Sequence, residues 1–240
     1  GFTGSNLPAK ASIREVRINS NPFSPEYDRP GFGRIEILTR PGMDKIRGQA
    51  FFQFNDENLN TRSPLLAQSS LPPYKQQFFG FNLGGPIIKQ KASFGIDFER
   101  RAIDDNAFVL ATKLDSNLNP QSINQGIVTP QTRMTFSPRL DYSINANNTL
   151  VLRYQHTGID MSNEGIGNYS LASRAYSQSD TEHTFQLTET SVLSPHLINE
   201  TRFQFMRTDL ARLGADNSPA ISVQGAFEGG GSTVGNSSTL

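Results

Sequence analysis

The residues that could do chemistry in this chain are few and scattered. Its 3 histidines, His156, His183 and His196, share no spacing typical of metal ligands, and we expect them to be solvated strand or turn residues. Asp104 and Asp105 are types that bind Ca²⁺ or transfer protons, but no glycine-bearing ligand pattern follows them. These residues therefore predict no metal site and no cofactor site.

Nucleophilic catalysis finds no better support. The chain has 0 cysteines, which removes disulfides, thiolate metal sites and cysteine nucleophiles. The G-x-S-x-G motif of serine hydrolases does not occur. The glycine run at 229–231 lacks the lysine and helix of a phosphate-binding loop. The sequence thus predicts a protein that is not an enzyme.

The composition excludes further classes of protein. Lys plus Arg and Asp plus Glu each number 22, so there is no basic excess for nucleic acid. Apolar residues make up 35%, and the aromatic residues are 17 Phe and 6 Tyr with no Trp. No apolar run approaches the roughly 18 residues of a transmembrane helix. Low hydropathy with frequent aromatic residues suits a barrel whose strands are apolar on one side only.

Alternation of apolar and polar residues recurs and predicts the elements that must position all these groups. In 133–144, Met134, Phe136, Leu140, Tyr142 and Ile144 alternate with polar residues, three of them charged, as in a strand with two different faces. Two early strands are expected at 13–19 and 33–40. Seven more are expected at 48–56, 78–85, 92–101, 133–144, 149–157, 182–193 and 199–207.

The connections between these strands alternate in length. Long segments are expected at 57–77, 104–130 and 211–240 and a moderate one at 161–175, and they alternate with short connections at 84–91, 145–148 and 194–197. Outer-membrane barrels have short periplasmic turns and longer extracellular loops. A soluble sandwich has no physical reason to sort its loops by end.

The charges decide which face is wet. A buried unpaired charge costs several kcal/mol, so the side that carries Glu99, Arg139, Asp141 and Arg153 must face water. The phenylalanine-rich side then requires an apolar partner, and lipid supplies one without a second sheet. We predict an all-β, antiparallel, up-and-down transmembrane β-barrel. The alternative from another class is a secreted, carbohydrate-binding β-sandwich.

A family resemblance begins at IREVRINSNPFSPEYDRPGFGRIEILTRPG. Its three parts, Ile13 to Ile18, Pro22 to Arg29 and Gly33 to Arg40, resemble the end of the plug domain of TonB-dependent outer-membrane receptors. Asp28 departs from the commoner glycine of that pattern. RGQAFFQFND resembles the first barrel strand, and FFGFNLGGPIIKQKASFGIDFERR, LDYSINANNTLVLRYQH and VLSPHLINETRFQF resemble the Oar-like subgroup, which has a carboxypeptidase-regulatory-like front domain.

The resemblance implies an organisation and a transport role. Residues 1–44 would end the plug, 45–210 would form the first seven strands of a larger barrel of about 22, and 211–240 would be a truncated extracellular loop. The chain would be a fragment of a receptor of the bacterial outer membrane. Such receptors take up chelates, vitamins, glycans or peptides with energy from an inner-membrane TonB-type complex. A structural or adhesive barrel is the second alternative, but it needs no plug.

The resemblance also suggests which residues carry function. Polar contacts between plug and barrel are expected from Arg29, Arg34, Glu36, Arg40, Glu99, Arg101, Arg139, Asp141 and Arg153. For each of these, plain solvation in a wet lumen is the alternative. Loops 57–77 and 104–130 would face the substrate or a partner. Tyr74, Phe78 and Phe108 would contact a ligand there, or else belong to the interfacial aromatic girdle.

Overall fold

The computed structural model describes residues 13–19, 34–39, 44–61 and 72–239, and this part of the chain is almost wholly β. No helix within these ranges is long and apolar enough to cross a bilayer. Two short 3₁₀ helices occur, η2 (Glu57–Leu59) and η3 (Ala172–Arg174). The strands are β1 (Ile13–Asn19), β2 (Arg34–Thr39), β3 (Arg47–Asp56), β4 (Lys75–Ile88), β5 (Ala92–Leu114), β6 (Pro120–Asn145), β7 (Asn148–Glu164), β8 (Tyr176–Ser194), β9 (Leu197–Gly214), β10 (Ala220–Val223), β11 (Phe227–Gly230) and β12 (Ser237–Thr239).

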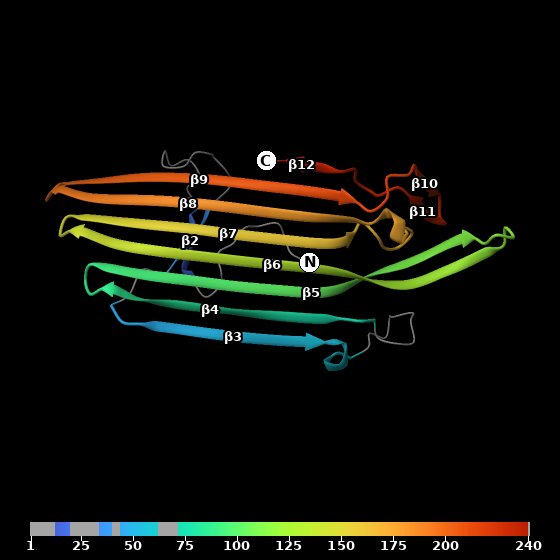
Figure 1. Cartoon of the computed structure of the whole chain (residues 1–240), viewed down its shortest axis with the longest axis horizontal. Coiled ribbons are helices and arrows are strands. Elements are labelled where there is room, and N and C mark those ends of the chain that lie inside the picture. The colour runs from blue at the N-terminus through green and yellow to red at the C-terminus, as the bar shows by residue number, and fades with distance from the viewer. Residues whose placement is uncertain (1–12, 20–33, 40–43, 62–71, 240) are drawn as a thin grey trace.

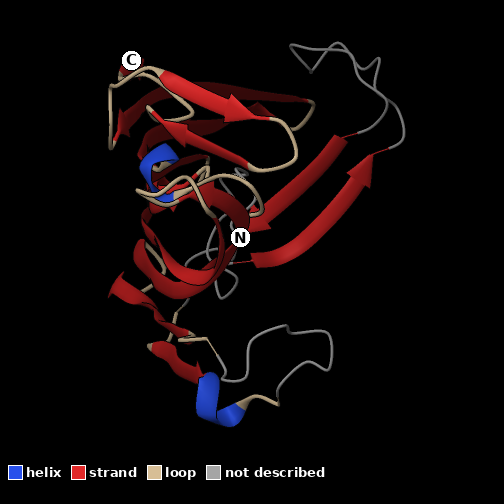
Figure 2. Ribbon diagram, turned by 90° about the vertical axis from the view of Figure 1, so that its right-hand side faces the viewer, coloured by secondary structure: helices blue, strands red, loops and turns tan. Residues whose placement is uncertain are grey.

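One antiparallel sheet dominates the structure. Its eight strands follow the order β12-β9-β8-β7-β6-β5-β4-β3, so β3 to β9 form an up-and-down meander (Figure 1). β3 and β12 are its edges, and the sheet is not closed. Figure 2 shows it as an open arc. β1 with β2 and β10 with β11 form two separate two-stranded sheets.

The seven strands expected after residue 45 are present as β3 to β9, and each is longer than predicted. The prediction of a loop over 104–130 is wrong. β5 runs to Leu114 and β6 begins at Pro120, which leaves a tight turn whose backbone closes from Asp115 N–H to the Asn119 carbonyl at 3.0 Å. β5 carries five consecutive apolar residues at 107–111, and β6 is mostly polar over 120–132, so neither segment shows the alternation that marks a strand.

Residues 211–240 also differ from the predicted loop. β9 continues to Gly214, β10 and β11 form a hairpin, and β12 pairs with β9 through Ser237 to Thr239. The last of these pairings adds an eighth strand to the sheet. The short connections at 145–148 and 194–197 are confirmed as tight turns. In the first, the Asn145 side chain accepts the Asn147 N–H at 2.9 Å.

The strand register fixes two unlike faces. Directly paired residues share a face, and Phe81, Phe98, Phe136, His156, His183 and Arg207 form one continuous row across six strands. This side is here called the apolar face. It also carries Phe52, Phe79, Ile96, Leu140, Leu152, Tyr154, Phe185, Leu187, Phe203 and Phe205. The opposite side, the polar face, carries Asp97, Glu99, Arg101, Arg133, Thr135, Arg139, Asp141, Arg153, Gln155, Gln186, Arg202 and Gln204.

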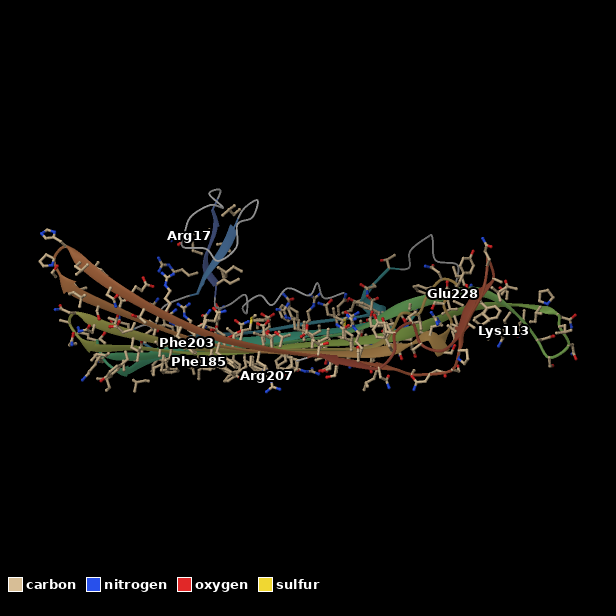
Figure 3. All side chains as sticks on the ribbon, turned by 90° about the horizontal axis from the view of Figure 1, so that it is seen from above. Arg17, Lys113, Phe185, Phe203, Arg207 and Glu228 are labelled. Atoms are coloured by element: carbon tan, nitrogen blue, oxygen red, sulfur yellow. The ribbon has the colours of Figure 1, made fainter. Side chains whose placement is uncertain are left out.

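The apolar face has no second layer over it in the described residues. Phe52 is 66% exposed, Phe203 55% and Phe136 36%, although they are among the largest apolar side chains of the chain. A contiguous apolar surface of this extent is untypical of a soluble monomer. Figure 3 places Phe185 and Phe203 on the convex side of the sheet and the β1–β2 hairpin on the concave side. The apolar face therefore requires an apolar medium outside the protein.

Candidate functional site

A cluster of charges lies at the middle of the polar face. Arg139 Nε and Nη2 donate to the two carboxylate oxygens of Asp141 at 2.8 and 2.6 Å, a bidentate pair between residues two apart on β6. Arg153 of β7 stands directly across from Arg139. Its Nε is buried and has no hydrogen-bond partner among the described residues. One carboxylate thus lies beside two guanidinium groups.

The other predicted contact residues divide into two groups. Glu99 and Arg101 lie on the same polar face, on β5, across from Thr135 and Arg133 of β6. Of the expected plug residues, Arg29 and Arg40 lie outside the described residues. Arg34 and Glu36 are in β2, paired with Asn19 and Arg17, and their side chains are not described. The structure therefore places the expected barrel residues on one face, and it does not describe the side chains of the expected plug residues.

The three aromatic residues expected at the ligand have different surroundings. Phe78 lies inside β4 with 9% exposure, and its ring meets Phe51 edge-on at 4.8 Å, so it belongs to the wall. Tyr74 precedes β4, where its hydroxyl donates to Gln76 at 3.0 Å. Phe108 lies within β5 and is half-buried. Tyr74 and Phe108 remain near the end of the sheet with the long connections.

Three segments far apart in sequence join at that end. The extended β5–β6 hairpin, the β7–β8 connection at 165–175 and the β10–β11 hairpin are linked through their backbones. The hydrogen bonds are Asn168 N–H to Phe108 O (2.6 Å), Leu110 N–H to Asn168 O (2.7 Å), Thr112 N–H to Ala226 O (3.0 Å), Leu171 N–H to Glu228 O (2.9 Å) and Glu228 N–H to Tyr169 O (2.8 Å). These three segments consequently form one hydrogen-bonded layer, here called the folded layer, at this end of the sheet.

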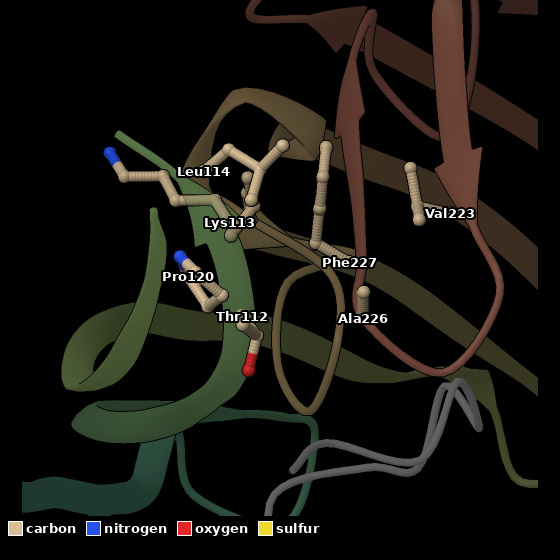
Figure 4. Close-up of a pocket in the computed structure, with 8 residues that line it drawn as sticks. Thr112, Lys113, Leu114, Pro120, Val223, Ala226 and Phe227 are labelled. Atoms are coloured by element: carbon tan, nitrogen blue, oxygen red, sulfur yellow. The ribbon is translucent and has the colours of Figure 1, made fainter. Parts of the chain in front are cut away.

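An open pocket of about 590 Å³ lies between these three segments (Figure 4). This volume falls within the roughly 300–1,000 Å³ typical of small-molecule sites. Its lining is mainly apolar, and the Lys113 ammonium points away from Phe227. The lining residues are Thr112, Lys113, Leu114, Pro120, Leu171, Val223, Ala226 and Phe227. The arrangement can hold an apolar group but has few polar atoms to orient one.

Comparison with known proteins identifies the class. Residues 38–132 and 106–239 match the family described as outer membrane beta barrel domain, which covers most of the chain. The chain belongs to this family. It is therefore a β-barrel protein of the bacterial outer membrane, whose apolar face meets lipid. A soluble sandwich is excluded.

One curated relative is similar to part of the chain. The chain is 29% identical over 92 residues to the TonB-dependent transporter Oar of Myxococcus xanthus, a match that covers 36% of this chain and 9% of that protein. The similarity is therefore distant and partial. No solved structure matches the chain.

The lipid side of this outer membrane barrel domain holds a contact that the sequence did not predict. His156 and His183 are 27 positions apart, yet they are paired across β7 and β8 with ring centroids 4.8 Å apart. The Tyr154 hydroxyl lies 2.7 Å from His183 Nδ1. No group of three or more His, Cys, Asp or Glu in the described ranges could hold a metal ion. The pair therefore stands at the surface without a third ligand.

The pocket at the long-loop end was also missed. Its residues Val223, Ala226 and Phe227 fall in 211–240, which reads as a Gly/Ser-rich loop by composition. The available signal was local: Gln224, Gly225 and Ala226 separate two four-residue strands, and Gly225 has φ +71° in this turn. A hairpin prediction from the glycine in this three-residue loop would have found one side of the pocket.

Proposed function

We propose that this chain forms part of the wall of a TonB-dependent outer-membrane transporter, with residues 13–39 as the last hairpin of its plug. The observation that carries the proposal is the β1–β2 hairpin on the concave, polar side of the sheet (Figures 2 and 3). A barrel that serves only adhesion or structure needs no segment inside its lumen. The distant similarity to Oar supports the same reading.

The open sheet supports a larger barrel. A sheet edge exposed to lipid leaves backbone N–H and C=O groups unpaired, at several kcal/mol each. β3 is such an edge, and so is β9 over the length that its three-residue pairing with β12 leaves uncovered, so further strands must pair with them in the membrane. In this proposal the polar face lines the lumen. The Arg153 guanidinium, whose buried Nε has no hydrogen-bond partner among the described residues, then pairs with acidic groups of the plug until energy from the inner membrane releases the plug.

The folded layer at the long-loop end is the proposed entry for substrate. It faces the exterior, because barrels of this kind place their long connections outside. The substrate would be a chelate, glycan, peptide or vitamin, and the mainly apolar pocket favours one with an apolar part. This role is binding and passage, not catalysis.

Conductance of the full-length receptor in planar bilayers tests the plug assignment without knowledge of the substrate. We expect the intact receptor to be closed to ions and a variant that lacks residues 13–39 to show stable open channels. Heat-dependent electrophoretic mobility checks that the variant still forms a barrel. Equal conductance of the two folded proteins would contradict the plug assignment and favour a structural or adhesive barrel.

A further inference from the structure

The paired histidines stand at one particular level of the lipid face. His156, His183 and Arg207 are direct neighbours across β7, β8 and β9, in one row of the register. The next row toward the short turns is apolar or aromatic, with Tyr154, Phe185 and Phe205. Figure 3 shows Arg207 on the same side of the sheet as Phe185 and Phe203. On β7, β8 and β9 the row therefore marks where the apolar belt ends, because the next row outward holds Gly158, Thr181 and Asp209.

The position in the membrane follows from the loops. The row lies on the side of the belt toward the long connections, which face the exterior in outer-membrane barrels. Hydrogen-bond donors that point outward here meet the headgroups of the outer leaflet. Arg207 is exposed and forms a 3.1 Å ion pair with Asp209, one row further out. An exposed pair of this kind contributes little to stability, so a phosphate group that binds the guanidinium more tightly can take the place of Asp209.

A notch lies beside the imidazole rings. Gly158 is two residues beyond His156 on the same face and pairs with Thr181 of β8. An added Cβ at Gly158 would lie 3.7 Å from His156 Nε2, and no other heavy atom beyond its chain neighbours lies within 4 Å of that position. The nitrogen of His156 is thus directed at space that any larger side chain would fill.

The hydrogen bond of Tyr154 concerns the position of the proton on the His183 imidazole. When the tyrosine hydroxyl donates to His183 Nδ1, the proton of the neutral imidazole is on Nε2, which becomes a donor. Two imidazoles and one guanidinium thus stand side by side in one row, and the His156 end of that row borders the notch. Phosphate oxygens are the acceptors that such donors bind most strongly.

We propose that Gly158, His156, His183 and Arg207 form a binding site for a phosphate group on the headgroup of an outer-leaflet lipid. The lipid's acyl chains would lie on the belt formed by Phe185, Phe203 and Phe205, and the phosphate would occupy the notch. The proposal does not depend on transport, because the site faces away from the lumen.

Binding of defined lipids to the full-length receptor in detergent micelles tests this. The probes are lipid A with its phosphates, the same lipid after enzymatic dephosphorylation, and inorganic phosphate, with native mass spectrometry as the readout. We expect Arg207→Gln combined with His183→Gln to weaken binding of phosphorylated lipid A by about tenfold or more, because the double variant loses two hydrogen bonds to a charged group. Dephosphorylated lipid should bind weakly to every variant.

Two further variants distinguish binding at this site from a nonspecific effect of positive charge on lipid binding. Gly158→Leu fills the notch, keeps all charges and suits a lipid-facing position, and it should reduce phosphorylated-lipid binding to a similar extent. Arg202→Gln removes the same charge from the polar face of β9 and should leave lipid binding unchanged. Equal binding of the two lipids, unchanged binding by Gly158→Leu, or inorganic phosphate binding as tightly as the lipid would each overturn the proposal.

Discussion

Leu187 occupies the middle of the lipid-facing belt, and its replacement by arginine tests the orientation of the sheet. Leu152 of β7 and Phe203 of β9 flank it directly, and Leu140 continues the row on β6. An arginine on the lipid face near the bilayer midplane destabilises a barrel by about 2–4 kcal/mol. We expect Leu187→Arg to lower the unfolding free energy of the full-length receptor by that amount.

Thr184→Arg is the matched control, because Thr184 lies on the same strand and faces the lumen. It loses one hydrogen bond to Glu182 of 3.1 Å, and the new guanidinium stands beside that carboxylate. The expected change is within about 1 kcal/mol. Denaturant titration of receptor folded in lipid vesicles, read by electrophoretic mobility, measures both. Equal destabilisation by the two variants, or a larger loss for Thr184→Arg, would refute the assignment of faces.

Three further predictions concern the exterior end. Asp115 accepts backbone N–H groups of Asn119 and Asn117, which lowers the pKa of its carboxyl. The turn should therefore be most stable above the unfolded pKa of about 3.9, and the protection of its amides against exchange should fall as pH drops below that value. Leu118 has φ +63°, and Leu118→Gly should slow the same exchange by removing left-handed strain of about 1 kcal/mol. Gly230 has φ +74° and an added Cβ would collide with the Pro219 carbonyl, so Gly230→Ala should expose 215–236 to protease, whereas Gly235→Ala, which has open space, should not.

The strands of the wall and their faces could be predicted because the sheet has one lipid side. Wherever a strand lies in the membrane, its sequence then alternates between apolar and polar residues, as at Phe203, Gln204 and Phe205. Above the belt both faces of β5 and β6 meet water or other loops. No alternation is required there, so 104–130 reads as a loop although it forms the hairpin with its turn after Leu114.

The groups that meet across strands could not be predicted from spacing. His156 and His183 become neighbours only through the register between β7 and β8, which the connection at 165–175 and the irregularity between Met161 and Glu164 determine together. The pocket has the same origin, because Leu114, Leu171 and Phe227 come from three connections whose contact depends on how the hairpins fold over one another. Such contacts cannot be inferred from the amino-acid composition.

Spin labels at Phe203 and Gln204 of the full-length receptor in lipid vesicles test the central claim most directly, because these adjacent residues point to opposite faces of β9. Collision with oxygen reports lipid, and collision with a water-soluble nickel chelate reports solvent. We predict that the label at position 203 is oxygen-accessible and protected from nickel, and that the label at 204 is the reverse. Accessibility to nickel at 203, or protection from both reagents there, would contradict a lipid-facing phenylalanine belt.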